Sequence, residues 1–113
     1  MLPAKYRLAK RKDIGRVMKR GRSFFVKDLT IRLVKNDLDN TRLTVVTSIK
    51  ISKKAVDRNR IKRQIREIIR KEILSDIKPG FDGLINTRKG LFELSHDELK
   101  KLIIGLFKKS RLI

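Results

Sequence analysis

The segment from Lys50 to Lys71 concentrates positive charge on what its spacing predicts to be a single helix. It contains ten Lys or Arg residues and only two acids, Asp57 and Glu67. Cationic side chains recur every four residues and so share one helical face; they are Arg58, Lys62, Arg66 and Arg70. Arg predominates here, and its forked guanidinium donors suit phosphate oxygens. The segment therefore predicts a surface that binds a phosphate backbone.

Apolar residues recur along the same segment at helical spacing, on a different face. They are Ile61, Ile65, Ile68, Ile69 and Ile73. We therefore expect a helix from about Val56 to Ser75 that packs one face on a core and exposes the other. Acids four residues away from the basic side chains are nearly absent, so little self-neutralisation of the charged face is expected.

Few residues in the chain could form a protein-borne active site. There is no cysteine, and His96 is the only histidine, which excludes zinc sites of the common kinds. No Gly-rich loop followed by Lys and Ser or Thr is present, so a nucleotide-binding loop is not expected. Asp37 and Asp39 could hold a cation, but such residues in an Asn/Asp cluster are more typical of a turn. We expect a role in binding, with no catalytic residue, metal or cofactor held by the protein alone.

The whole chain has a formal net charge of +19, from 31 basic and 12 acidic residues among 113. A compact body with this charge repels itself unless a polyanion neutralises it, so nucleic acid is the first candidate partner and an anionic membrane surface the second. The exposed face of the predicted basic helix has only Asn59 and Gln64 as amides. That composition favours backbone and shape recognition, as with folded RNA, over base reading in DNA.

The length favours one domain, residues 1–113. Hydrophobic residues make up 40 % of the chain, which is enough for a modest core. No apolar stretch approaches the roughly 20 residues that a membrane span needs, and the N-terminus lacks the apolar segment of a secretory signal. The sequence thus predicts a cytoplasmic protein without a membrane partner.

Periodicity predicts the elements that precede the basic helix. A short helix is expected over about residues 11–20, ended by Gly21. Alternating apolar residues over 29–33 predict a strand, and the β-branched run over 41–47 predicts its antiparallel partner after an Asn/Asp turn. Residues 48–52 could continue as a third strand.

After the basic helix, Pro79-Gly80 interrupts the chain and residues 82–87 predict a buried strand. Ser95 and Glu98 match a capping box that opens a final helix. This helix would place five apolar residues on one side: Leu99, Leu102, Ile103, Leu106 and Phe107. The order is helix, two or three strands, helix, strand, helix, which is typical of an α+β domain.

The run Arg58-Asn59-Arg60-Ile61-Lys62-Arg63, followed by Arg66-Glu67, resembles the signature of the bacterial ribonuclease P protein subunit. Other positions resemble that family too: Arg7-Leu8, Lys12-Asp13-Ile14, Gly21, Ala55-Val56, Asp82, Arg88-Lys89 and Leu106-Phe107-Lys108-Lys109. The resemblance covers almost the whole chain.

The resemblance implies a ribosomal protein S5 domain 2-like α+β fold of order α-β-β-β-α-β-α, with a four-stranded sheet and a left-handed β-α-β crossover. It also implies a protein that binds the catalytic RNA of ribonuclease P and the 5′ leader of precursor tRNA. The protein would assist endonucleolytic removal of that leader to give the mature 5′ end. The RNA subunit, which requires Mg²⁺, would carry out the chemistry, and no DNA partner is expected.

The expected RNA-binding residues lie on and beside the basic helix; they are Lys50, Lys53, Lys54, Arg58, Asn59, Arg60, Lys62, Arg63, Arg66, Arg70, Arg88 and Lys89. The resemblance implies a leader cleft between the first helix and the sheet, with Arg11, Lys12, Ile14, Met18 and Arg32. At the last three of these positions the family commonly carries two Phe and a Tyr. Leader contacts should therefore be weaker unless Arg32, Phe24 or Phe25 compensates. The loop over residues 48–54 lacks the family's Gly and is expected to differ.

Two alternatives stay open from the residues alone. One is a ribosomal or other structural RNA-binding protein without a role in catalysis. The other is a protein nuclease, which the missing catalytic constellation disfavours. Cleavage assays with and without the catalytic RNA would separate all three.

Overall fold

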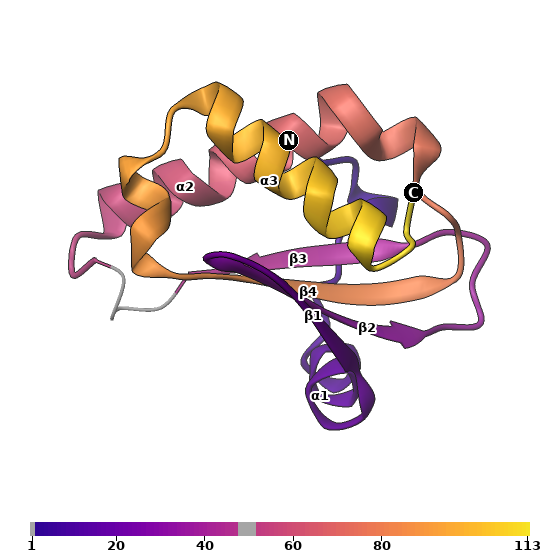
Figure 1. The fold of residues 1–113 in the computed structure, drawn as a ribbon. Helices are drawn as coiled ribbons and strands as arrows, with labels where there is room; N and C mark the ends of the chain where they lie inside the picture. Colours follow the sequence, from indigo (N-terminus) through magenta and orange to yellow (C-terminus); the bar gives the residue numbers. More distant parts are fainter. Residues whose placement is uncertain (1, 48–51) are drawn as a thin grey trace.

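A four-stranded sheet separates two helices on one face from a third helix on the other (Figure 1). The computed structural model describes residues 2–47 and 52–113. The helices are α1 (Arg11–Arg20), α2 (Ala55–Ile68) and α3 (His96–Lys109), and the strands are β1 (Arg22–Val26), β2 (Leu29–Lys35), β3 (Arg42–Val46) and β4 (Phe81–Thr87). This order confirms the predicted α-β-β-β-α-β-α arrangement of a small α+β domain.

The pairing of β3 differs from the prediction. It is not the antiparallel partner of β2 but pairs in parallel with β4, and the strand order is β1-β2-β4-β3. Residues 82–85 of β4 are buried on both faces of the sheet, as in a central strand, so β4 takes the place beside β2. Alternation within 41–47 indicates a strand but carries no information about its partner. The crossover from β3 to β4 through α2 is present, and its left hand stays a prediction.

The strand β1 is one that the sequence patterns do not predict. It pairs with β2 across a two-residue turn at Lys27 and Asp28. Lys27 has a φ of 47°, a backbone conformation that hairpin turns usually assign to Asn or Gly, so the turn carries no sequence signal. Of the third strand expected over 48–52, residues 48–51 lie outside the described part of the chain, and Ser52 is not in a strand.

The main core lies between the sheet and the pair α2 and α3. The five Ile residues predicted to face the core from the basic helix are all buried there, which confirms that face. The helix continues beyond α2 as a π-helical turn (Ile69–Ile73) and a 3₁₀ turn (Leu74–Asp76), so the predicted span 56–75 is helical with a changing pitch. The opposite side of α2 is therefore left for solvent or a partner.

The start of α3 confirms the predicted capping box. The Glu98 backbone N–H donates to Ser95 Oγ at 3.2 Å, and the Ser95 backbone N–H donates to Glu98 Oε1 at 3.0 Å. This reciprocal pair satisfies two helix-end donors and defines where the helix begins. Four of the five apolar residues expected on its inner side are buried, and Leu102 is half-buried.

A second, smaller core attaches α1 to the other face of the sheet. Val17 of α1 is fully buried against Leu8 and Leu84, with Ile14 and Val34 packed around them. Residues at the far end of this sheet face are not covered by α1: Phe25 is 49 % exposed and Val46 is 38 % exposed. The face therefore divides into a covered part and an open part, and the open part is available to a ligand.

Candidate nucleic-acid interface

The first turn of α2 is held by the residues that precede it. The Arg58 guanidinium donates to the backbone oxygen of Ser52 at 2.7 Å, and Ser52 Oγ donates to Asp57 Oδ2 at 3.1 Å. Arg58 is half-buried, so part of its donor capacity is used to orient the entry into α2. Lys53 and Lys54 are exposed beside it, and the predicted contact at Lys50 lies outside the described residues.

The far end of the predicted charged row is neutralised within the protein. Arg70 donates through two nitrogens to the two carboxylate oxygens of Glu67, both at 2.9 Å. This hydrogen bond from Arg70 is the main reason that the pKa of Glu67 falls to about 2. The expectation of little self-neutralisation is therefore wrong at Arg70, because its partner lies three residues away rather than four. Arg60 lies 3.9 Å from Asp57, a longer and more exposed pair.

The middle of α2 presents the least compensated cations. None of the ion pairs among the described residues involves Lys62, Arg63 or Arg66. Arg60 and Arg63 are exposed, and Lys62 and Arg66 are half-buried along the same helix. We call Asn59, Arg60, Lys62, Arg63 and Arg66 the cationic face of α2. Guanidinium groups without an ion pair, such as those of Arg63 and Arg66, can each donate two hydrogen bonds to a phosphate, so this face has the chemistry needed to bind a phosphate backbone.

The sequence-predicted cleft residues do not all lie together. Met18 and Arg32 border a hollow of about 230 Å³ with Phe25, Thr30, Asn86 and Arg88, and we call this hollow the cleft. Ile14 instead packs into the small core under α1. Arg11 and Lys12 are exposed and border a different, shallow surface of α1. Of the predicted set, two residues line the cleft and three do not.

Five cleft residues are absent from the predicted site residues: Ser23, Phe25, Thr30, Leu84 and Asn86. The sequence suggested Phe25 only as an aromatic that could compensate for the missing ones. Phe25 and Met18 are large apolar side chains that are 49 % and 52 % exposed. In β1 the side chains alternate, so Phe24 turns toward the main core and Phe25 toward the open face. Recognition of β1 as a strand would have found Phe25; Asn86 has no comparable signal.

Arg32 lines the cleft, but its guanidinium group donates its hydrogen bonds to the end of α1. Its Nη2 donates to the Gly21 oxygen at 3.2 Å, and its Nε lies 3.4 Å from the Val17 oxygen. These carbonyls end α1, where a cation also complements the helix dipole. Arg88 and Lys89 follow β4 and are exposed; Arg88 borders the cleft. The segment that follows β4 lies at the end of the sheet where α2 begins (Figure 1).

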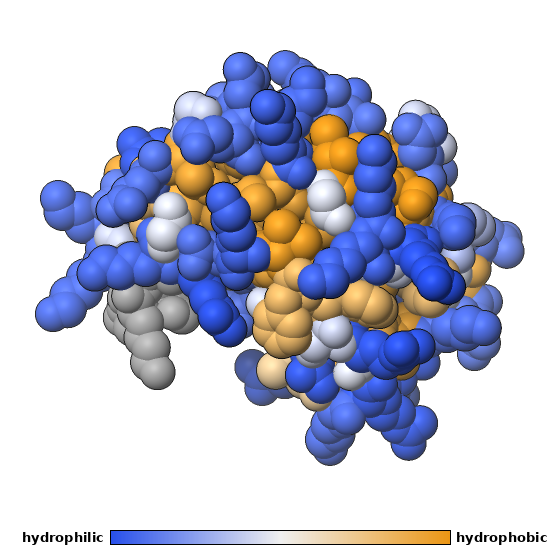
Figure 2. Space-filling view, viewed as in Figure 1, coloured by the Kyte–Doolittle hydropathy of each residue, from blue (hydrophilic) through white to orange (hydrophobic). Residues whose placement is uncertain are grey.

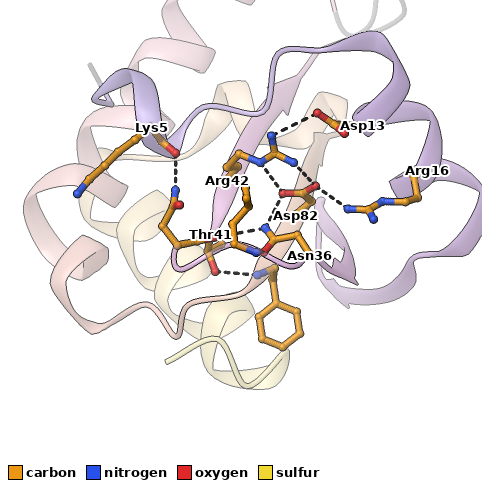
Figure 3. Close-up of polar contacts among 10 residues, drawn as sticks. Lys5, Asp13, Arg16, Asn36, Thr41, Arg42 and Asp82 are labelled. Carbon is orange, nitrogen blue, oxygen red and sulfur yellow. Dashed lines mark hydrogen bonds and ion pairs between the residues drawn. The ribbon is translucent and has the colours of Figure 1, made fainter.

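A buried carboxylate on β4 connects α1, β3 and the loop after β2 (Figure 3). Asp82 is fully buried and accepts from two nitrogens of Arg42 at 2.8 and 2.7 Å, and from Arg16 at 3.1 Å. Asn36 Nδ2 donates to it at 2.8 Å, and Arg42 also reaches Asp13 at 3.3 Å. One carboxylate thus connects four segments of the chain and sets the position of α1 on the sheet.

The electrostatics of this network favour the charged form of Asp82. Burial by itself raises the pKa of the carboxyl group, but hydrogen bonds from Arg42, Asn36 and Arg16 and the charge of Arg42 outweigh it. The pKa of Asp82 therefore lies below its ordinary value. Its partner shifts in the complementary direction, since the hydrogen bond to Asp82 raises the pKa of Arg42. At neutral pH each charged member has an ion-pair partner, and Arg16 Nε is the one described nitrogen of the network that is buried without a hydrogen-bond partner.

The residues that the structure describes contain no group of three or more His, Asp or Glu placed to hold a metal ion. Within the same residues, no helix is both long enough and apolar enough to cross a membrane. The arrangement as a whole offers a cationic helix face and an open, partly apolar sheet face.

Comparison with known proteins identifies the family. The family model described as Ribonuclease P matches residues 2–111. The chain belongs to the ribonuclease P protein family. The ribonuclease P protein component of Microcystis aeruginosa is 37 % identical over 111 residues, which cover 91 % of this chain and 92 % of that protein. The corresponding protein of Clostridioides difficile is 36 % identical, with 91 % and 90 % covered.

Solved ribonuclease P proteins share the fold. The protein of Staphylococcus aureus superimposes with a TM-score of 0.84 at 25 % identity, over 95 % of this chain and 96 % of that one. The protein of Thermotoga maritima gives a TM-score of 0.80 at 30 % identity, over 90 % and 94 %. These matches confirm the resemblance inferred from the signature of α2 and the small α+β fold.

Proposed function

We propose that this chain binds the catalytic RNA of ribonuclease P through the cationic face of α2 and so assists removal of the 5′ leader from precursor tRNA. The observation that carries the proposal is a row of four cations along α2, at Arg60, Lys62, Arg63 and Arg66. Among the described residues, only Arg60 of these four has an ion-pair partner, in the long contact with Asp57. These cations belong to the family signature and lie on α2, whose opposite side is buried in the core. The binding surface is therefore rigid before the RNA arrives, which lowers the entropic cost of association.

The chemical step belongs to the RNA partner in this proposal, with Mg²⁺ held by that RNA. Supporting this division, His96 is exposed at the start of α3, and the two acids of α2, Asp57 and Glu67, are each paired with an Arg side chain. The protein would contribute binding and orientation, as a cytoplasmic subunit of a ribonucleoprotein. A precursor tRNA would be shared between the RNA subunit and the protein.

The cleft is the proposed contact for the single-stranded leader. Phe25 and Met18 offer apolar surface on which a base can stack, and Arg88 lies at the rim for a phosphate. In this arrangement Phe25, from β1, takes over the stacking function expected of aromatic residues on α1. Asn86 and Thr30 add hydrogen-bonding groups on the floor of the sheet.

The deciding experiment measures precursor cleavage by the catalytic RNA at low magnesium, with and without the protein. We expect the protein to increase cleavage and to show no cleavage without the RNA. No increase would favour a structural RNA-binding protein instead, and cleavage by the protein alone would favour a protein nuclease.

A double substitution tests the surface itself. Arg63→Ala with Arg66→Ala removes two cations that have no ion-pair partner among the described residues. Each lost phosphate contact lowers the log–log salt slope of RNA binding by roughly 0.7–0.9. The matched control, Lys101→Ala with Lys108→Ala, removes the same charge from exposed positions on another helix, α3. Equal slopes for both variants would refute the assignment of α2.

A further inference from the structure

A second basic surface lies away from α2 and outside the cleft. A hollow of about 730 Å³ opens where β1 begins, β2 ends and β4 begins, next to the C-terminal end of α3. Six of its eleven lining residues are cationic: Arg20, Arg22, Lys35, Lys78, Lys109 and Arg111. We call this site the basic hollow. In the whole chain 31 of 113 residues are cationic, so the hollow is enriched beyond the general charge of the protein.

No carboxylate compensates this charge locally. None of the described residues that line the basic hollow is Asp or Glu. None of the ion pairs found within residues 2–47 and 52–113 involves one of the six cations. Lys109 and Arg111 are adjacent to the C-terminal end of α3, where they complement the helix dipole. Arg20 has the same position at the end of α1. Arg22, Lys35 and Lys78 have no such role, and they come from β1, β2 and the loop before β4.

The floor of the hollow is apolar. Phe24, Leu33 and Phe81 line it, and both Phe side chains are half-buried. The Arg22 guanidinium lies over the Phe24 ring, 5.9 Å from its centre, so a cation and an aromatic ring are in contact at the edge of this floor. Figure 2 shows apolar surface on the side where α3 and β1 face the viewer, bordered by long hydrophilic side chains.

We infer that the basic hollow binds a nucleotide of single-stranded RNA, with the base on the Phe24 and Phe81 floor and the phosphates on Arg22, Lys35 and Lys78. The size falls in the range of small-ligand sites, roughly 300–1,000 Å³. An apolar floor ringed by cations suits a base with its flanking phosphates. A folded duplex is less suited, because its bases are not available to an enclosed floor.

The position of the hollow makes it a separate contact. α3 packs over β1 and β2, whereas α2 packs over β3, so the basic hollow and α2 lie toward opposite edges of the sheet. The cleft lies on the other face of the sheet, beside α1. An RNA strand in the hollow could therefore be held together with RNA on α2. This inference does not depend on the identity of the RNA that binds α2.

The test is a titration of the whole protein with a short oligouridylate, followed by the amide NMR shifts of Phe24, Lys35 and Phe81. These local signals report the hollow even if the oligonucleotide also occupies another surface. Saturable shifts at these amides are expected. Arg22→Gln with Lys78→Gln should reduce the salt slope of this local binding by about 1.4, from two single-strand phosphate contacts. Phe24→Leu should weaken it roughly tenfold through lost stacking.

The matched control is Lys71→Gln with Lys101→Gln, which removes two exposed charges outside the hollow. It should leave the local affinity close to that of the unmodified protein. Equal weakening by the control and the Arg22/Lys78 variant would overturn the site, as would an absence of shifts at the three amides. A second titration uses uridine monophosphate in place of the oligonucleotide. If it shifts the same amides with the affinity of the oligonucleotide, the hollow is a mononucleotide site and the RNA-strand assignment is overturned.

Discussion

The cationic face of α2 and the cleft beside α1 are assembled in opposite ways. The α2 residues are neighbours in sequence, and helical periodicity alone sends them to one side. The cleft takes its residues from α1, β1, β2, β4 and the loop after β4, and the Asp82 network helps to hold α1 over it. A surface of the first kind tolerates the loss of one member, because each side chain acts by itself. A surface of the second kind depends on a few buried contacts far from the ligand.

The largest expected effect tests that dependence. Asp82→Ala leaves Arg42 and Arg16 without their buried partner and should lower the free energy of unfolding by about 3 kcal/mol. This value is at the lower end of the range for a broken buried ion pair, because both Arg side chains reach solvent. Urea unfolding measures this change. The control Glu67→Ala breaks the exposed pair on α2 and should cost far less. If both variants lost a similar free energy of unfolding, the contrast between the two surfaces would be refuted.

The next effect concerns the ligand side of the cleft. Phe25→Ala removes a half-exposed ring and should weaken binding of precursor tRNA to the assembled ribonucleoprotein roughly fivefold, the low end of one stacked base. Binding of mature tRNA, which lacks the leader, should not change. Val46→Ala is the control, since Val46 is also exposed but does not line the cleft. A loss of affinity for both tRNAs would place Phe25 outside the leader contact.

A gain of affinity would sharpen the comparison further. Met18→Phe supplies an aromatic ring at an exposed position on α1, and we expect precursor tRNA to bind up to about fivefold more tightly. Ile14→Phe should not reproduce this gain, because Ile14 packs under α1 and a larger side chain there strains the core. Affinities for precursor and mature tRNA, with thermal unfolding of each variant, separate the two outcomes. Tighter binding by Ile14→Phe would show that the cleft extends under α1.

The smallest expected effect is a difference in how added salt changes the pKa values of two carboxyl groups, Glu67 and Asp82. The pKa values of Glu67 and Asp82 are both depressed, so each contributes stability above its ordinary pKa that is lost as the pH falls through its folded pKa. For Glu67 this window runs from 4.5 down to about 2. In about 1 M salt the Debye length is about 3 Å, so the pKa of exposed Glu67 should rise and that of buried Asp82 should hardly move. Carboxyl NMR titrations at two salt concentrations would show it, and equal rises would contradict the structural contrast.

The sequence predicts the elements of this protein better than their pairing. Helical spacing placed five Ile residues of the basic helix in the core, and the capping box at Ser95 and Glu98 located the start of α3. Both signals are local, because they depend on residues within a few positions of one another. The parallel pairing of β3 with β4 depends on residues about forty positions apart, and no local pattern encodes it.

The candidate sites also divide into features set by local sequence and features set by long-range contacts. The basic character of the chain and the arrangement of cations on one side of the α2 helix were determined by the sequence alone, since charge and helical phase belong to the chain itself. Only the tertiary structure decided that Arg70 is neutralised by Glu67, that Arg32 holds the end of α1, and that Phe25 faces the cleft. It also brought six cations from separate segments to the basic hollow. These outcomes depend on distances between side chains of distant elements, which folding sets and a linear pattern does not contain.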